Sequence, residues 1–338
     1  MKKERKEIGR VLFCLMSTIL VIVLFALVSG TAFAQTTKYP TRPVNLICTY
    51  AAGGGSDTWL RITGKFLEKQ LRVPIVVANQ AGNGGLLQLQ NTMTNIPPDG
   101  YTISQIEGST VIARAMGMVG PDMRSSSEVT VLGCGVNELY FLVAREASNY
   151  KTLKDFVSDC KARPGEVRVA CTALGSTMTG IAYYLEKMGV PLKVAPLGST
   201  ANQMIELVSG RINTAVLDYG SALPYLGKEV ELSKRLRLLA FSGTKRFSVE
   251  PNIPTFRELG YDIAHGTFQG LAVRPDTPKD IAGTLVRAFR DTHHDPAYVD
   301  ALEKAGRVGM YYQSPEQMVN QIEIYWKIGE DFKKSSKN

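Results

Sequence analysis

The stretch YAAGGGSD, Tyr50 to Asp57, places three consecutive glycines between an apolar segment and a predicted helix. Residues 44–50 have the continuous apolar character of a buried strand, and Ser56 or Asp57 is a suitable helix N-cap. Glycine is used where the backbone turns sharply or where a ligand must approach it closely. Because unpaired N–H groups at a helix N-terminus attract anions, this loop predicts an anion-binding site.

The same order of strand, glycine loop and helix recurs twice. Gly82–Gly85 lies between a predicted strand at 74–78 and a predicted helix that begins at Leu86, and Gly175 follows a predicted strand at 167–171. Alternating strands and helices predict parallel sheets covered by helices, which bind ligands beyond the carboxyl ends of the strands. We therefore expect an α/β fold in which three glycine loops present N–H donors to one cleft.

The amino-terminal segment has the features of an export signal. Basic residues precede an uncharged apolar run at 11–28, and Ala32-Phe33-Ala34 supplies the small-residue pattern of a signal peptidase site. We interpret residues 1–34 as a signal peptide that is cleaved on export to the periplasm. The apolar run is also long enough to span a bilayer, so an uncleaved membrane anchor is the alternative. Both interpretations predict an exported protein.

Length and charge restrict the classes of partner. The 338-residue chain is long enough for two domains of about 150 residues each. It has 39 basic and 31 acidic residues and a net charge of +8. The charges alternate in sign, without the basic blocks and interleaved aromatic residues that follow a phosphate backbone. The composition therefore argues against nucleic acid and is compatible with a small anionic ligand.

Cysteine and histidine residues show no metal-binding pattern. Four cysteines follow the predicted signal peptide, and their spacing contains no CxxC motif. We expect buried thiols, with a single disulfide between Cys160 and Cys171 as the alternative. His293 and His294 resemble an exposed helix end. The sequence thus predicts no metal site.

Nucleotide and catalytic motifs are also missing from the sequence. The glycine loops do not match GxGxxG, and no GxxxxGK[ST] phosphate loop occurs. There is no GxSxG nucleophile elbow and no HExxH. We expect no cofactor and no catalytic residues.

Short motifs follow one another along most of the chain beyond residue 38. They are Tyr39-Pro40-Thr41-Arg42-Pro43, Ala52–Asp57, Gly82–Gly85, Pro98–Thr102, Gly175–Thr177, Gly198-Ser199, Leu207–Ile212, Asp218, Ser221–Pro224, Pro251–Thr255, Glu258–Tyr261 and Thr277–Asp280. In this order they resemble the Bug or TctC family, the extracytoplasmic solute-binding proteins of tripartite tricarboxylate transporters.

The resemblance implies a periplasmic binding protein of type II, with two α/β lobes, two hinge strands and a ligand cleft between the lobes. Lobe 1 would comprise residues 36–137 and 263–338, and lobe 2 residues 138–262. The ligand would be a small carboxylated solute that the protein delivers to the membrane subunits of the transporter. The protein itself would be a monomer.

The resemblance also implies which residues bind the solute. From lobe 1 they are Tyr50, Ala52, Gly54, Gly55, Ser56, Asp57, Asn83, Gly84, Gly85 and Leu86. From lobe 2 they are Ser176, Thr177, Thr179, Ser199, Thr200 and Asp218. We expect Asp57 to cap its helix and brace the loop rather than contact an anion. Asp218 would orient water or accept a hydrogen bond from an amino group or hydroxyl.

The chain departs from the family pattern at positions that bear on ligand choice. Gln80-Ala81 replaces a frequent Arg-Pro, and Thr179 stands where many relatives have histidine. The usual apolar segment before the three glycines is here Thr49-Tyr50-Ala51-Ala52, so Tyr50 is expected to line the pocket and narrow it. These changes favour a carboxylate with a hydroxyl or aromatic part over a plain tricarboxylate.

Two other functions are compatible with the sequence. An extracytoplasmic sensory or scaffold protein could have the same fold with a degenerate pocket. An exported enzyme could act on a carboxylate in the same cleft, and it would need an acid–base pair positioned there.

Overall fold

The computed structural model describes residues 38–82, 85–308 and 311–335, together with Met16. The predicted signal peptide lies outside these residues apart from Met16, as do Asn83 and Gly84. In the described part of the chain, no helix combines the length and apolar character needed to cross a membrane. One compact unit, Pro40–Asn338, contains all the strands described below.

Strands and helices alternate through most of this unit, as predicted. In chain order the elements are β1 (Val44–Cys48), α2 (Gly55–Leu71), β2 (Ile75–Asn79), α3 (Leu86–Asn95), β3 (Thr102–Glu107), α4 (Gly108–Ala115), β4 (Thr130–Arg145), α5 (Leu153–Ala162), β5 (Arg168–Cys171), α6 (Thr177–Lys187), β6 (Lys193–Pro196), α7 (Thr200–Val208), β7 (Thr214–Asp218), α8 (Tyr219–Ala222), η2 (Leu223–Tyr225), β8 (Leu236–Phe241), β9 (Gly266–Val273), α9 (Lys279–His293), α10 (Pro296–Lys304), β10 (Tyr312–Gln313) and α11 (Pro315–Ser335).

The strands form a sheet in the order β2-β1-β3-β9-β4-β7-β5-β6, with β8 and β10 also paired to β4. At one end β1 is parallel to β2 and β3, and at the other β5 is parallel to β6 and β7. Between them, β9 and β4 run antiparallel to their neighbours. The two parallel groups confirm the predicted α/β class.

The 16-residue strand β4 belongs to both halves of the sheet. Its first part pairs with β9 as far as Leu139, opposite Gly266. From Tyr140, opposite Asp218, it pairs with β7 instead. The first part contains Gly133 and Gly135, whereas Tyr140–Ala144 in the second part is continuously apolar.

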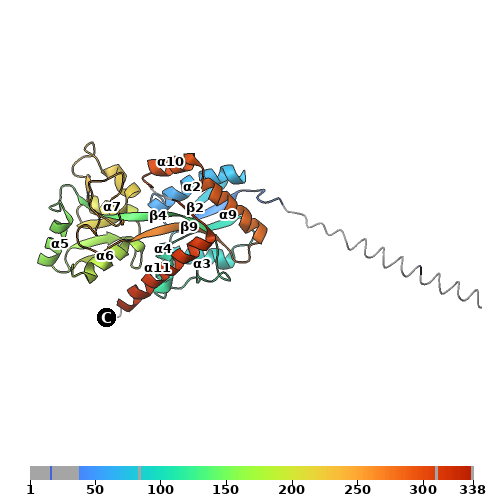
Figure 1. Ribbon diagram of the computed structural model, residues 1–338, viewed down its shortest axis with the longest axis horizontal. Helices are drawn as coiled ribbons and strands as arrows, with labels where there is room; N and C mark the ends of the chain where they lie inside the picture. The colour runs from blue at the N-terminus through green and yellow to red at the C-terminus, as the bar shows by residue number, and fades with distance from the viewer. Residues whose placement is uncertain (1–15, 17–37, 83–84, 309–310, 336–338) are drawn as a thin grey trace, which may run out of the picture. The chain divides into compact units, whose positions relative to one another are not determined.

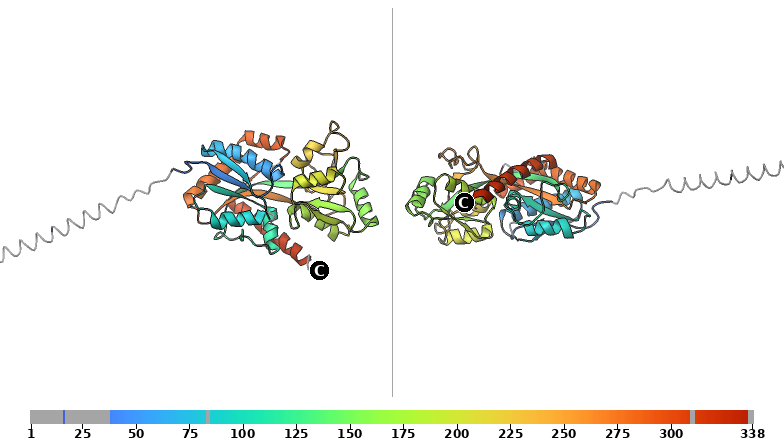
Figure 2. Two further views of the ribbon diagram at one scale, coloured as in Figure 1. Left: turned by 180° about the vertical axis from the view of Figure 1, so that it is seen from behind. Right: turned by 90° about the horizontal axis from the view of Figure 1, so that it is seen from below.

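The buried side chains form separate clusters on either side of this change of partner. One cluster contains residues between 86 and 134 and between 268 and 332. The other two contain residues between 140 and 263. Figures 1 and 2 show α5, α6 and α7 around one part of the sheet and α2, α3, α4, α9, α10 and α11 around the other, with β4 and β9 running between them. The fold therefore has two lobes.

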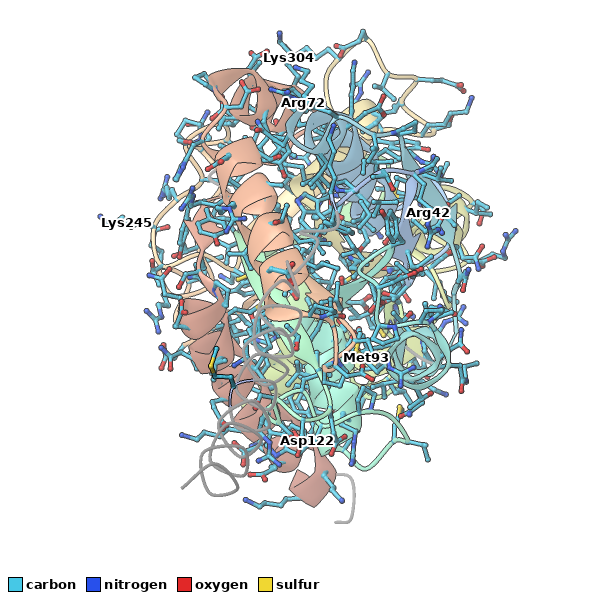
Figure 3. All side chains as sticks on the ribbon, turned by 90° about the vertical axis from the view of Figure 1, so that its right-hand side faces the viewer. Arg42, Arg72, Met93, Asp122, Lys245 and Lys304 are labelled. Atoms are coloured by element: carbon cyan, nitrogen blue, oxygen red, sulfur yellow. The ribbon has the colours of Figure 1, made fainter. Side chains whose placement is uncertain are left out.

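Charged side chains surround these lobes. Arg42, Arg72, Lys245 and Lys304 are exposed and lie in different parts of the molecule in Figure 3. Their distribution over different elements agrees with the alternating charges of the sequence. It does not resemble the continuous basic face of a nucleic-acid-binding protein.

Two local predictions concern cysteine and histidine. Cys48, Cys134, Cys160 and Cys171 are buried reduced thiols, so the structure contradicts the alternative of a disulfide between Cys160 and Cys171. The prediction that His293 is exposed is wrong. It is buried against Phe289, Tyr298 and Tyr312, and Nδ1 lies 2.9 Å from the Phe289 carbonyl oxygen.

Candidate functional site

A small cavity of about 40 Å³ lies where four helices begin. Helices α2 and α4 come from one lobe, and α6 and α7 from the other. Each helix contributes lining residues from its first turn or cap: Gly54, Gly55 and Ser56 (α2), Glu107 and Ser109 (α4), Thr177 and Met178 (α6), and Thr200 (α7). The positive ends of four helix dipoles therefore face one small space.

The first glycine loop is held open by Asp57, from the first turn of α2. Gly53 has φ +83°, a conformation that favours glycine. Its N–H donates to Asp57 Oδ2 over 3.0 Å, and Arg61 Nε donates to the same oxygen over 3.1 Å. Asn79, at the end of β2, donates to Asp57 Oδ1 over 2.8 Å. Asp57 thus fixes the conformation of the loop by accepting from its backbone, as expected. The hydrogen bonds that it accepts also lower the pKa of its carboxyl.

Gly55 is required because an arginine lies against it. Arg307 follows α10 and is buried, and its Nη2 occupies the space that a Cβ at Gly55 would need. A guanidinium thus reaches the start of α2 from a segment 252 residues further along the chain. Only glycine leaves room for this contact.

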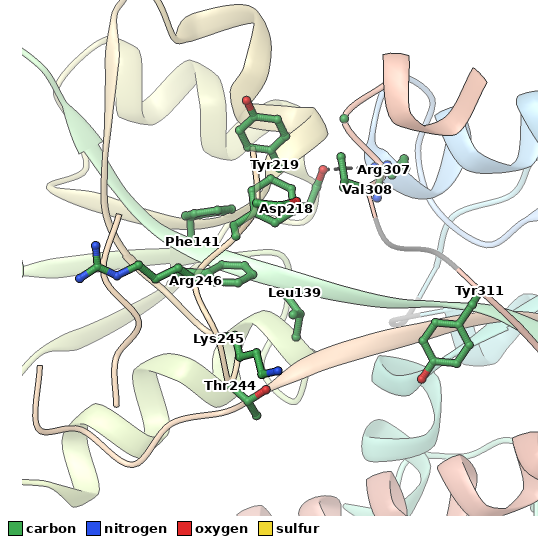
Figure 4. A pocket seen from close by; sticks show the side chains of 14 residues that line it. Leu139, Phe141, Asp218, Tyr219, Thr244, Lys245, Arg246, Arg307, Val308 and Tyr311 are labelled. Carbon is green, nitrogen blue, oxygen red and sulfur yellow. Dashed lines mark ion pairs between the residues drawn. The ribbon is translucent and has the colours of Figure 1, made fainter. Parts of the chain in front are cut away.

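Arg307 also forms an ion pair across the two lobes. Its Nη2 lies 3.2 Å from Asp218 Oδ1, and both side chains are only 3% exposed (Figure 4). Asp218 caps α8: Oδ1 accepts from the Ser221 N–H over 2.8 Å, and Oδ2 accepts from Ser221 Oγ over 2.6 Å. Burial raises the pKa of Asp218 and lowers that of Arg307 to about 10. These hydrogen bonds and the ion pair hold the Asp218 carboxylate in place, and Asp218 forms part of the wall of the central cavity.

This ion pair separates the central cavity from a second one on the other face of β4. Successive side chains on a strand point to opposite faces. Accordingly Tyr140 lines the central cavity, whereas Leu139 and Phe141 line the second one, shown in Figure 4. Asp218 lines both cavities, whereas Arg307 lines the second one but not the central one. The ion pair therefore lies between the two spaces.

The lobes contact each other beside the central cavity. Ser109 Oγ in α4 accepts from the Thr177 N–H of α6 over 3.0 Å. Thr177 Oγ1 lies 2.6 Å from the Tyr140 hydroxyl, and the Thr177 carbonyl oxygen lies 2.7 Å from His265 Nε2. Burial lowers the pKa of His265 to about 4, so its ring is neutral at neutral pH. The start of α6 is thus held by α4, by β4 and by His265, which directly precedes β9.

The cavity already contains a carboxyl group, that of Glu107. Glu107 ends β3, precedes α4 and is 6% exposed. Its Oε2 accepts from Ser56 Oγ over 3.2 Å and from Gln105 Nε2 over 3.4 Å. Burial raises the pKa of Glu107, and hydrogen bonds from Tyr50, Ser56 and Ser109 oppose the shift. The site therefore combines helix N-termini with a buried acid.

Comparison with known proteins identifies the family of this chain. A family model described as the tripartite tricarboxylate transporter family receptor, TctC, matches residues 60–327. The chain belongs to this family. A relative from Cupriavidus necator, described as a UPF0065 protein in the gbd 5' region, is 31% identical over 290 residues that make up 85% of each chain.

Solved structures show the same fold as this chain. The periplasmic binding protein BugD aligns with a TM-score of 0.78 at 22% identity, over 88% of this chain and 98% of BugD. MatC from Rhodopseudomonas palustris, solved with bound malate, aligns with a TM-score of 0.76 at 23% identity, over 87% of this chain and all of MatC. The predicted family and fold class are both confirmed.

The structure brings many of the predicted site residues of this TctC chain to the cleft. Those that line the central cavity are Tyr50, Gly54, Gly55, Ser56, Thr177, Thr200 and Asp218. Gly85 and Ser176 line an adjoining cavity, which shares Tyr50, Ser109 and Thr172 with the central one. Tyr50 lines both cavities, and its narrowing of the pocket stays a prediction.

Other predicted site residues have structural roles in the described part of the chain. Ser199 caps α7 by accepting from the Asn202 N–H, and Thr179 Oγ1 donates to the Ala173 carbonyl over 2.6 Å. Leu86 is fully buried in a hydrophobic core, and Ala52 is exposed within the first glycine loop. Because the Leu86 side chain packs inward, only its backbone could face a ligand.

Sequence reasoning missed seven residues that line the central cavity, and it missed Arg307, which pairs with Asp218 in the cavity wall. The seven are Glu107, Ser109, Tyr140, Thr172, Met178, Thr267 and Gln269. Glu107 and Ser109 carried a usable signal, because Glu107-Gly108-Ser109 is a further junction of strand, glycine and helix. Arg307 carried none, since its segment has no distinctive local pattern.

Proposed function

We propose that this protein captures a small carboxylated solute in the cleft between its lobes and delivers it to the membrane subunits of a tripartite tricarboxylate transporter. The observation that carries the proposal is the meeting of four helix N-termini at one cavity. Backbone N–H groups and helix dipoles at such termini bind carboxylates. The malate bound to MatC is an example of this ligand class in the same fold.

The available donors can supply the affinity that a transport receptor needs. A hydrogen bond to a charged group contributes roughly 1.5–3 kcal/mol, so four such bonds contribute about 6–12 kcal/mol. Micromolar binding requires about 8 kcal/mol. Backbone and hydroxyl donors from both lobes are therefore sufficient without an arginine that contacts the solute.

We assign the lobes to residues 36–137 with 263–338 and to residues 138–262. The change of partner along β4, between Leu139 and Tyr140, supports the first boundary. The start of β9 at Gly266 lies close to the second. A hinge at these strands would let the lobes close on the solute and present a joint surface to the membrane subunits.

The working location that we propose is the periplasm, reached through cleavage of the signal peptide at residue 34, and the working form is a monomer. The family membership and the fold shared with BugD support the location. Mass spectrometry of protein from the periplasmic fraction would test the cleavage site, because a mature chain begins at Gln35. An intact amino terminus in the membrane fraction would favour the anchor.

The test of solute binding is a thermal-shift screen of the refolded protein against mono-, di- and tricarboxylates, aromatic acids and acidic amino acids. A ligand at 100 times its Kd adds about 2.7 kcal/mol to stability, which raises Tm by roughly 5–10 °C. Gly54→Val should abolish the shift, because its side chain fills the cleft while φ −88° suits valine. A screen without any shift would contradict carboxylate binding and favour a scaffold or sensory role.

A further inference from the structure

The second cavity, on the face of β4 opposite the central one, is large enough for a small molecule. Its volume is about 340 Å³, and ligand pockets typically have volumes of about 300–1,000 Å³. Figure 4 shows its side chains on two sides, with Phe141 and Tyr219 from one lobe and Val308 and Tyr311 from the other. A molecule bound here would contact both lobes at the hinge without entering the solute cleft.

Aromatic rings form one wall of this cavity. Phe141 stacks on Phe241, with ring centroids 4.6 Å apart and an angle of 28° between the planes. Phe247 packs edge-on against Phe141 with 5.7 Å between centroids, and it lies 4.9 Å from the Tyr219 ring. Phe141 and Phe241 are buried, whereas Phe247 is only half-buried, so part of its ring surface remains for a ligand. A further ring would extend this cluster in the same stacked or edge-on arrangements.

The charged side chains of the lining leave one positive charge at its edge. Arg307 forms its buried ion pair with Asp218. Arg246 pairs with Glu258 over 2.9 Å, and in Figure 4 its guanidinium points away from the cavity. Lys245 also lines the cavity, is exposed and forms no ion pair in the part of the chain that the structure describes. Its ammonium favours a ligand that carries a negative charge.

We propose that this cavity is a second binding site, for a small anion with an aromatic ring that packs against Phe141 and Phe247 while the anionic group faces Lys245. The site goes beyond the proposed function, because it lies on the opposite face of β4 from the solute cleft. Burial of the ring supplies most of the affinity, since an ion pair with an exposed ammonium adds little. For a ligand of about ten non-hydrogen atoms we expect a Kd of about 0.1–1 mM.

The experiment is a ligand-observed NMR titration of Gly54→Val, whose valine keeps solutes out of the cleft. The probes are phenylacetate, phenylacetamide, which has the same shape without the charge, and acetate, which has the charge without the ring. Phenylacetate should bind about three- to fivefold more tightly than phenylacetamide, because the amide has no charge to pair with Lys245. Acetate should bind at least about tenfold more weakly, because it buries no ring.

Lys245→Met, made in the same Gly54→Val background, should bind phenylacetate and phenylacetamide with equal affinity, because it removes the ammonium and keeps most of the side chain. Lys161→Met removes the same charge from an exposed position of α5 and should keep the preference for phenylacetate. Equal preferences in these two variants would overturn the role of Lys245 and with it the proposed ligand class.

A second pair of variants tests the position of the site. Val308 lines the cavity and is half-buried, so Val308→Trp should fill the space and weaken phenylacetate binding at least about tenfold. Val319→Trp adds the same bulk at an exposed position of α11 and should leave binding unchanged. Melting curves without ligand establish that each variant is folded.

The outcomes separate this site from the solute cleft. If wild-type protein binds phenylacetate but folded Gly54→Val does not, the aromatic acid occupies the cleft, so the second site is wrong and the proposed function stands. Absence of phenylacetate binding to both proteins, or binding that survives unchanged in Val308→Trp, also overturns the second site. Binding to Gly54→Val that Val308→Trp removes supports it, whether or not the cleft binds a carboxylate.

Discussion

The guanidinium of Arg307 lies directly against the backbone of Gly55, where a Cβ would overlap with Nη2. The same nitrogen pairs with Asp218 of the other lobe over 3.2 Å. The start of α2 is thereby linked through one arginine to the end of β7. This link explains why the third glycine of the loop is needed: the position must have no side chain.

Gly55→Ala should destabilise the protein, because its methyl group would displace the buried guanidinium from Asp218. Overpacking of this kind costs about 1–3 kcal/mol. Gly54→Ala is the matched control, since its Cβ would meet only the Ala51 carbonyl oxygen at 3.8 Å, and we expect a change below about 0.5 kcal/mol. Urea unfolding at pH 7 measures both. Equal stabilities of the two variants would contradict the close contact.

Arg307→Met should be more damaging, because it leaves the Asp218 carboxylate buried without its partner. Breaking a buried pair costs about 3–5 kcal/mol. The double variant Arg307→Met/Asp218→Asn should recover part of this loss, as it removes the unpaired charge. Lys304→Met breaks an exposed pair with Asp300 and should cost less than about 1 kcal/mol. Chemical unfolding measures the stability of all three variants. A double variant no more stable than Arg307→Met would contradict the buried ion pair between Arg307 and Asp218.

His265 should make stability depend on pH between about 6.5 and 4. Burial lowers its native pKa to about 4, whereas the unfolded ring titrates near 6.5. Below pH 6.5 the unfolded state therefore takes up a proton that the native state does not bind, and stability falls. Between pH 7 and 5 this contribution amounts to about 2 kcal/mol.

Replacing His265 by glutamine removes that contribution, so the difference in unfolding free energy between pH 7 and pH 5 should shrink by the same amount. Glutamine can still donate to the Thr177 carbonyl. His294→Gln, at an exposed position, should retain the wild-type difference. If the unfolding free energies of His265→Gln and His294→Gln had the same pH dependence, the conclusion that His265 is neutral in the native state would be wrong.

The four buried thiols should be unreactive until the protein unfolds. Burial raises the pKa of Cys48, Cys134 and Cys160 to about 12 and that of Cys171 to about 11, so little thiolate is present at pH 8. Titration of the mature protein with a chromogenic disulfide reagent should detect no thiol within minutes in buffer and all four in guanidinium. Detection of only two after unfolding, rising to four after reduction, would indicate a disulfide.

The sequence by itself determined the local part of this structure. The α/β class, the loop at 50–57 and the helix that begins near Ser176 follow from hydrophobic periodicity, glycine placement and capping residues. These signals depend on neighbours within a few positions of the chain, so they are readable without the fold. The bracing role of Asp57 is of the same kind, since it contacts Gly53 and Arg61.

Only the tertiary structure decided how the site is completed. Glu107 meets Ser56, Ser109 meets Thr177, and Arg307 meets Asp218, and each pair joins segments that lie far apart in the sequence. Their proximity depends on the order of strands in the sheet and on the change of partner along β4. The burial of His293 has the same origin, because aromatic side chains from other elements cover the end of α9. Packing between distant segments leaves no periodic pattern in either one. For that reason neither Glu107 nor Arg307 was predicted, although the loops of this cleft and Asp218 were.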